Sequence, residues 1–414
     1  MSRAHVRVLR PLAVLASATL VLAACGEGSR DAITTPVSPE AGEINWLWWF
    51  SLALGTLVYV AVLVLLAVPL VRARRRARRD AHLDDLRTRV HGRDGGQRAS
   101  AASEKGDPSL VLSEPPDTSR PLDTAPAALV DEPLAAADPG LAAEARRDAP
   151  VRSRLIWWGG LILPAIILLV LLVAASTVGA RTAHVAEDGD LVIEVVGHMF
   201  WWEVVYPDHD VVTANEIVIP TDQRVRLVLT TDDVIHSFWI PRLHGKVDMI
   251  PGTVNDLTFT ATEEGFFRGH CAEYCGIAHA QMVKFVEAVS PAAFDTWVEQ
   301  QQQAPVGAEV TETTAEGERL FFATGCADCH AVRGTNAIGA IGPDLSHLAS
   351  RRTLAAGIVP NTREQLGRLI VDPWGVKPGN PMPPTVLSDE ELEALLDYLE
   401  TFSAEGAARM EGGS

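Results

Sequence analysis

The hydrophobic residues form two long uncharged runs in the first half of the chain and short alternating runs in the second half. The long runs extend from Ile44 to Val71 and from Leu155 to Ala180. At about 1.5 Å per helical residue, each exceeds the roughly 30 Å hydrocarbon core of a bilayer. The pattern therefore predicts two transmembrane helices, residues 44–71 and 155–180.

The charges beside these runs predict how the helices are oriented. An arginine-rich segment, Arg72 to Arg79, follows the first run, and Arg152 and Arg154 precede the second. Because basic residues favour the cytoplasmic side, residues 72–154 are predicted to be a cytoplasmic loop and everything after Ala180 to be external. The weak hydrophobicity of this loop predicts disorder.

The N-terminus has the pattern of an export signal. Arg3, Arg7 and Arg10 precede an apolar run that ends in small residues, which predicts a signal peptide over residues 1–24. The ending "LAAC" resembles the lipobox of bacterial lipoproteins, so Cys25 is a predicted lipidation site. An ordinary signal with an incidental cysteine is the alternative.

From Asp190 the hydrophobic pattern changes to short alternating or β-branched runs such as "RVRLVLTT" and "VKFVEAV", separated by Gly, Pro and Asp. Residues 181–300 are therefore predicted to form a compact all-β sandwich or barrel. A polar linker is predicted over residues 301–314, a helical domain over 315–402 and a tail over 403–414. Ser388 and Glu391 predict a capping box for the last helix.

Composition agrees with a multidomain membrane protein. The chain has 414 residues, of which 47% are hydrophobic and 21% charged. From residue 181 onward, 35 Asp and Glu outnumber 15 Lys and Arg. Nucleic acid is an unsuitable partner for such a surface. A basic protein partner and simple solubility of an exported domain both remain open.

One stretch of the predicted β-domain, "GHCAEYCGIAHAQM" from Gly269 to Met282, is unusually rich in metal ligands. Zinc is one candidate, but a thioether at Met282 and a second histidine upstream, His236, favour copper. A single copper site needs one cysteine, whereas Cys271 and Cys275 could bridge two ions. A disulfide between these cysteines is the alternative in an oxidising compartment.

A second redox motif, "CADCH", lies near the start of the helical domain. Cys-x-x-Cys-His is the attachment sequence of a c-type haem, which predicts covalent links to Cys326 and Cys329 and an axial ligand at His330. Met382, in "GNPMPP", is the predicted sixth ligand because methionine keeps the potential high. His347 is the main rival, and Met410 in the Gly-rich tail is a poor one.

These motifs resemble a known family. His236 with "CAEYCGIAHAQM" resembles the dinuclear copper site, CuA, of cytochrome c oxidase subunit II. The membrane hairpin and "GHMFWWEVVYPD" are similar to that family too, over roughly residues 40–71 and 155–300. Residues 315–402 resemble small bacterial cytochromes c, with "CADCH", "GPDL" and "MPP" in order. The implied fold is a transmembrane hairpin, a cupredoxin-like sandwich and an all-α class I cytochrome c domain.

The resemblance also implies roles for individual residues. Cys271 and Cys275 would be bridging thiolates; one copper would add His236 and Met282, and the other His279 and the Glu273 carbonyl. The Glu273 carboxylate would meet a magnesium ion shared with the catalytic subunit, and Pro343 would support His330. The family's electron-accepting aromatic segment corresponds here to Phe200, Trp201 and Trp202, with Phe at the position of an exposed Trp.

The resulting interpretation is subunit II of a respiratory haem–copper oxidase in a bacterial plasma membrane, with two copper ions and one haem c. Electrons would pass from a soluble cytochrome c or a quinol–cytochrome c reductase through the haem and copper to subunit I, which reduces O2 and pumps protons; subunit III is a further partner. Two other enzymes share part of this pattern. Nitrous oxide reductase shares the copper motif but lacks the membrane hairpin, and a quinol oxidase subunit II has the hairpin but lacks the copper ligands. A copper-delivery lipoprotein or an inert anchor has no use for a haem.

Overall fold

The computed structural model describes residues 34–94, 150, 153–183, 187–305, 312 and 314–403. The predicted signal peptide, Cys25 and the tail after residue 403 lie outside these residues, as does most of the predicted cytoplasmic loop. The chain divides into two compact units: one contains Met1–Trp49 and Ala174–Ser414, and the other contains Phe50–Val173.

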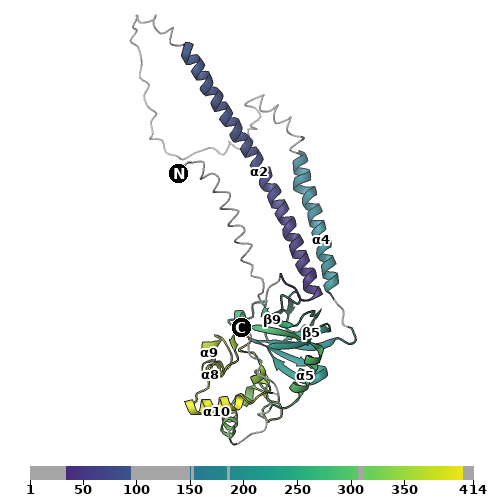
Figure 1. Ribbon diagram of the computed structural model, residues 1–414, viewed down its shortest axis with the longest axis vertical. Coiled ribbons are helices and arrows are strands. Elements are labelled where there is room, and N and C mark those ends of the chain that lie inside the picture. Colours follow the sequence, from purple (N-terminus) through teal and green to yellow (C-terminus); the bar gives the residue numbers. More distant parts are fainter. Residues whose placement is uncertain are drawn as a thin grey trace, which may run out of the picture. The chain divides into compact units, whose positions relative to one another are not determined.

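Among the described residues, two helices are long and apolar enough to cross a membrane, with candidate spans Pro39–Leu86 and Ser153–Thr182 (Figure 1). The first belongs to α2, Pro39–Asp94. The second comprises a π-helical stretch, Ile156–Ile162, continued by α4, Leu163–Thr182. Their apolar side chains are largely exposed, as at Leu65 and Leu168. Such surfaces suit lipid or partner helices, in agreement with the predicted hairpin.

The first helix is longer than the sequence pattern predicts. α2 does not stop at Val71 but continues through the arginine-rich segment to Asp94. No glycine or proline occurs between residues 72 and 91, and Arg, Ala and Leu are good helix formers. The first part of the predicted loop is therefore helical.

Ten strands form a sandwich of two sheets, which confirms the all-β, cupredoxin-like prediction (Figure 1). The first sheet has the order β3-β2-β1-β5-β8 and the second β4-β10-β9-β6-β7. In the first sheet the strands are β1 Leu191–His198, β2 Trp201–Tyr206, β3 Val211–Ala214, β5 Arg224–Thr231 and β8 Asn255–Thr260. In the second they are β4 Glu216–Pro220, β6 His236–Trp239, β7 Val247–Met249, β9 Gly265–Cys271 and β10 Val283–Val289.

Alternation along the strands builds the core between the two sheets. In β1 every second side chain is buried, including Ile193 and Val195. Burial alternates in the same way along β5, where Val225 and Leu227 are buried. β6 pairs antiparallel with β9, so Phe238 lies opposite Cys271. This register brings the start of β6 beside the end of β9, where the segment Gly269–Met282, hereafter the ligand loop, leaves the sheet.

The helical domain, residues 314–403, follows α5 (Pro291–Gln302). Its helices are α6 Ala315–Ala323, α7 Cys326–Cys329, α8 Arg363–Val371, α9 Pro373–Val376 and α10 Asp389–Leu399, with a short hairpin of β11 Thr353–Leu354 and β12 Val359–Pro360. α6 packs against α10 over a core that includes Phe321, Leu395 and Tyr398. The predicted capping box at Ser388 and Glu391 is confirmed.

Candidate functional site

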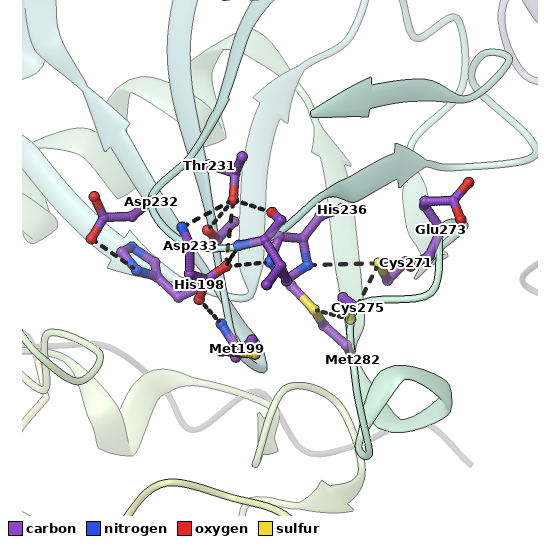
Figure 2. Close-up of polar contacts among 12 residues, drawn as sticks. His198, Met199, Thr231, Asp232, Asp233, His236, Cys271, Glu273, Cys275 and Met282 are labelled. Atoms are coloured by element: carbon purple, nitrogen blue, oxygen red, sulfur yellow. Dashed lines mark hydrogen bonds and ion pairs between the residues drawn. The ribbon is translucent and has the colours of Figure 1, made fainter. Parts of the chain in front are cut away.

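The ligand loop brings its two cysteines together at one end of the sandwich. Cys271 ends β9 and Cys275 lies four residues later, with their Sγ atoms 3.8 Å apart. Each sulfur also faces a histidine. Cys271 Sγ lies 3.8 Å from Nδ1 of His236 (Figure 2), and Cys275 Sγ lies 3.7 Å from Nδ1 of His279. Both cysteines are free, so the structure does not have the alternative disulfide.

The other two predicted ligands complete the cluster. The Met282 thioether sulfur lies 3.7 Å from Cys275 Sγ, and the Glu273 carbonyl accepts a 3.2 Å hydrogen bond from Cys271. The donor atoms of His236, Cys271 and Cys275 all lie within 4.8 Å of one another. These residues and Met282 are buried. Two thiolates, two imidazoles, a thioether and a carbonyl form a soft donor set that fits copper.

The thiols of the ligand loop share their protons unequally. The contact between the two sulfurs holds the pKa of Cys271 well below its usual range, despite burial. The same contact raises the pKa of Cys275, which burial raises further. The two thiols therefore titrate as a coupled pair. A metal that binds both sulfurs must displace the protons that they hold.

Asp233 orients His236 from behind the cluster. Its carboxylate lies 2.8 Å from His236 Nε2 and also accepts backbone hydrogen bonds from Met199 and Val234. Burial opposes the charge on His236, but its hydrogen bonds to Cys271 and Asp233 prevail and raise its pKa. With Nε2–H donated to Asp233, the ring directs Nδ1 toward the sulfurs (Figure 2).

Replacing Asp233 with asparagine is therefore expected to weaken copper binding without unfolding the sandwich. Asparagine keeps an acceptor near His236 Nε2 but loses the negative charge, and loss of such a partner typically weakens metal affinity about 10–100-fold. Competition with a graded copper chelator measures the change. The matched control is Asp232→Asn, a neighbouring exposed carboxylate close to His198 rather than to His236. Equal affinity in D233N and the parent would contradict the orienting role.

An apolar cavity, lined mostly by the helical domain and partly by the sandwich, brings the predicted haem residues together; we call it the haem cavity. Cys326, Cys329, His330 and Met382 all line it. His330 Nδ1 lies 2.7 Å from the Pro343 carbonyl, which leaves Nε2 available for iron. Burial lowers the pKa of His330, which keeps the ring neutral and able to bind a metal. The cavity fits a covalently attached haem.

The rival axial ligand, His347, lies elsewhere. Met382 lines the haem cavity, whereas His347 lines a different hollow, together with Arg333 and Asp344. Burial lowers the pKa of His347 to about 4, so it is a neutral side chain between two arginine-bearing segments. The structure therefore favours Met382 over His347.

The three predicted aromatic residues have different surroundings. Phe200 and Trp201 line the haem cavity. Trp202 is fully buried in the sandwich, with its ring centroid 5.9 Å from that of His236. Phe200 also lies against the ligand loop, because its ring atoms are 3.0 Å from where a side chain on Gly276 would begin. Phe200 thus lines the haem cavity and also packs against the ligand loop.

Two protein-family models match regions of the chain that contain these sites. "Cytochrome C oxidase subunit II, periplasmic domain" matches residues 210–289, and "Cytochrome c" matches residues 314–403. Cytochrome c oxidase subunit 2 of Alkalihalophilus pseudofirmus is 38% identical over 250 residues, which cover 58% of this chain and 71% of that protein. The chain belongs to the cytochrome c oxidase subunit 2 family.

Other similar proteins in the same family include cytochrome c oxidase subunit 2 of Bacillus subtilis, 36% identical over 59% of this chain and 71% of that protein. Among solved structures, the periplasmic domain of cytochrome oxidase subunit II (CoxB) of Bradyrhizobium japonicum is 32% identical. It aligns with 28% of this chain and 97% of its own, with a TM-score of 0.28.

Membership of the cytochrome c oxidase subunit 2 family makes this chain part of a haem–copper oxidase, an oxidoreductase complex whose O2-reducing site lies on another subunit. The two matched domains imply copper of the CuA type and haem as cofactors. Together with the two apolar helices, the family indicates a membrane protein with periplasmic domains.

Sequence reasoning missed several residues around these centres in the oxidase subunit. Asp233 had a weak signal, since it lies three residues before His236. Lys284 is fully buried, with Nζ 3.9 Å from the Trp202 ring centroid, and Lys377 is buried at the haem cavity. Glu216 accepts hydrogen bonds from the backbone of Arg352 and Thr353 in the helical domain. The sequence around isolated charged residues of this kind has no pattern that predicts their burial.

Proposed function

We propose that electrons enter this subunit at a haem c in the helical domain and leave through a dinuclear copper centre in the ligand loop toward subunit I. There they would reduce O2 to water with proton translocation. The observation that carries the proposal is that the haem attachment residues and Phe200 line one cavity, while Phe200 also packs on the ligand loop. The two candidate centres therefore share a wall.

In the ligand loop, Cys271 and Cys275 would hold the two copper ions between them. His236 and Met282 would complete one ion, and His279 with the Glu273 carbonyl the other. Each of these four donor atoms lies within 3.8 Å of one of the two sulfurs, which supports a centre built around both cysteines. When bound, such a copper pair supplies a one-electron couple shared by two ions. Asp233 and the surrounding apolar core hold the donors in place for it.

In the haem cavity, Cys326 and Cys329 would form the two thioether links, and His330 and Met382 would bind iron. The Pro343 carbonyl fixes the orientation of His330. Residues 379–383, hereafter the methionine loop, carry Met382. The Asn380 side chain accepts a 3.0 Å hydrogen bond from the Met382 backbone, which restrains this loop. Of the three predicted electron-transfer residues, Phe200 and Trp201 line the haem cavity and would contact the haem, and Trp202 would lie beside them near His236.

The partners follow from the same proposal. The exposed apolar side chains of α2 and α4 would contact lipid and subunit I, with subunit III as a further neighbour, in a bacterial plasma membrane. The sandwich and helical domain would lie on the external face and the arginine-rich end of α2 in the cytoplasm. The acidic surface would meet a soluble cytochrome c or a quinol–cytochrome c reductase. Glu273 would bind an interfacial magnesium ion, and Cys25 would carry a lipid.

The deciding experiment measures both cofactors in the same protein. The full chain, produced with haem attached and then loaded with copper, should contain two copper ions per haem. In the oxidised protein, one unpaired electron should show EPR hyperfine splitting from both copper nuclei. One copper per haem with splitting from a single nucleus would overturn the proposal and indicate a mononuclear cupredoxin–cytochrome fusion.

A further inference from the structure

A buried lysine lies in the wall between the two candidate centres. Lys377 follows α9, is 3% exposed and lines the haem cavity. Its Nζ donates one hydrogen bond of 2.6 Å to the Phe200 carbonyl and another of 3.1 Å to the Ala355 carbonyl. Phe200 belongs to the sandwich and Ala355 to the helical domain. The amine therefore ties the two domains together through the main chain of each.

Burying this amine is unfavourable by itself. Desolvation lowers the pKa of Lys377 to about 7, although the nearby Cys275 opposes the shift. A long apolar side chain such as methionine would occupy the same space without that penalty. The two hydrogen bonds to main-chain carbonyls offset the loss of water in either protonation state, because an amine keeps N–H donors when it is neutral.

Short chains of contacts connect Lys377 to both centres. Toward copper, the ring of Phe200 lies against Gly276, the residue after Cys275. Toward haem, the Lys377 carbonyl accepts a 3.0 Å hydrogen bond from the Asn380 backbone, and the Asn380 side chain accepts one from Met382. Lys377 thus lies between Phe200, which packs against the ligand loop, and the loop that carries the predicted axial methionine.

The ligand loop and Phe200 meet the methionine loop at a contact surface that we call the seam. The seam has a second close contact, which involves no polar group. A Cβ atom on Gly379 would lie 2.0 Å from the Ile277 side chain, so the methionine loop and the ligand loop touch there. Gly379 also has a φ of +85°, a conformation that favours glycine. The seam is therefore a fitted surface, and Lys377 supplies a directional polar tie across it.

We propose that Lys377 is a positioning residue for electron transfer within this chain: its amine fixes the Phe200 main chain against the methionine loop and so sets the distance between haem and copper. The inference rests on the proposed function, since it requires electrons to cross this seam. Small displacements matter at such a site, because an error of about 1 Å in a reacting geometry can reduce a rate about a hundredfold.

The test compares Lys377→Met with the parent in the full chain, with haem attached and copper loaded. Flash reduction of the haem by an attached photoreductant, followed by the optical signals of both centres, gives the transfer rate. K377M keeps the side-chain length but has no donor, and we expect transfer to slow by about tenfold or more. K377Q, which keeps an N–H donor on a shorter side chain, should be intermediate.

Two controls separate positioning from general damage. Arg319→Met removes an exposed, ion-paired cation from α6 of the helical domain and should leave the transfer rate unchanged. Oxidation of the reduced haem by added ferricyanide should be equally fast in K377M and the parent, because it does not use the seam. Copper per haem should also be equal in both proteins.

Each outcome has one meaning. A parent-like transfer rate in K377M with both centres intact overturns the positioning role and leaves the proposed function standing. If K377M loses haem or copper, K377Q decides, since a parent-like rate in that variant overturns the role and a slower rate supports it. Absence of haem-to-copper transfer in the parent itself contradicts the proposed function instead.

Discussion

Replacing Cys275 with serine is expected to abolish the two-copper EPR pattern and lower oxidase turnover by more than about a hundredfold, while the haem stays attached. Cys275 Sγ lies 3.7 Å from both His279 Nδ1 and Met282 Sδ, and 3.8 Å from Cys271 Sγ. A hydroxyl is a poor ligand for copper. Loss of an outer partner already costs about 10–100-fold in affinity or activity, and loss of a direct ligand should cost more.

The control for Cys275→Ser is Tyr274→Phe, a change at the adjacent exposed residue of the same loop. It removes one hydroxyl group and should leave the copper content, the EPR pattern and turnover at parent values. Metal analysis, EPR of the oxidised protein and oxygen consumption by the assembled oxidase are the measurements. If C275S kept two coppers per haem and the two-nucleus splitting, the bridging role of Cys275 would be wrong.

The ligand sets could be predicted from sequence because most of their members are close neighbours in the chain. Four side-chain donors lie within the ligand loop, and "CADCH" places both haem thiols and the proximal histidine on one turn. His236 was the distant member, and its position at the start of a short strand next to β9 brings it to the loop. Alternation of apolar residues likewise predicted the strands, since each has one face in the core.

The contacts between the sandwich and the helical domain could not be predicted in this way. Arg352 pairs with Glu287 of β10, and Glu216 of β4 accepts hydrogen bonds from Thr353. These partners are separated by tens of residues and follow no period. Desolvation raises the pKa values of Glu216 and Glu287 above their usual range, against the opposing effect of their partners. Only docking of the two domains shows why these charges are buried.

α2 extends beyond the predicted transmembrane segment for a different reason. That prediction ends where hydrophobicity ends, at Val71, because charge marks the limit of the membrane. Helix formation depends on backbone propensity and breakers, not on hydrophobicity, and neither glycine nor proline occurs between residues 72 and 91. The membrane boundary and the helix boundary are therefore separate predictions.

Replacing Met382 with histidine is expected to keep the haem attached and six-coordinate but to lower its potential, which makes its reduction by the upstream donor unfavourable and its oxidation by copper more favourable. Axial-ligand identity tunes haem potentials over a span of about 0.8 V, and methionine raises the potential relative to histidine. Each fall of about 59 mV in a one-electron couple shifts the equilibrium tenfold. A fall of about 200 mV would therefore shift the haem–copper equilibrium toward reduced copper by more than about a thousandfold. Optical redox titration of the haem measures the shift, and flash reduction measures the new equilibrium.

His347→Ala is the matched control for Met382→His, because His347 is the rival that the sequence leaves open. His347 lies 4% exposed in a hollow with Arg333 and Asp344 rather than in the haem cavity, so its removal should leave the haem spectrum and potential at parent values. The opposite result, an unchanged potential in M382H and a changed one in H347A, would transfer the sixth ligand to His347. Hydrogen bonds connect Met382 through Asn380 to Lys377. If Met382 were not the sixth ligand, these hydrogen bonds would no longer connect Lys377 to the haem iron.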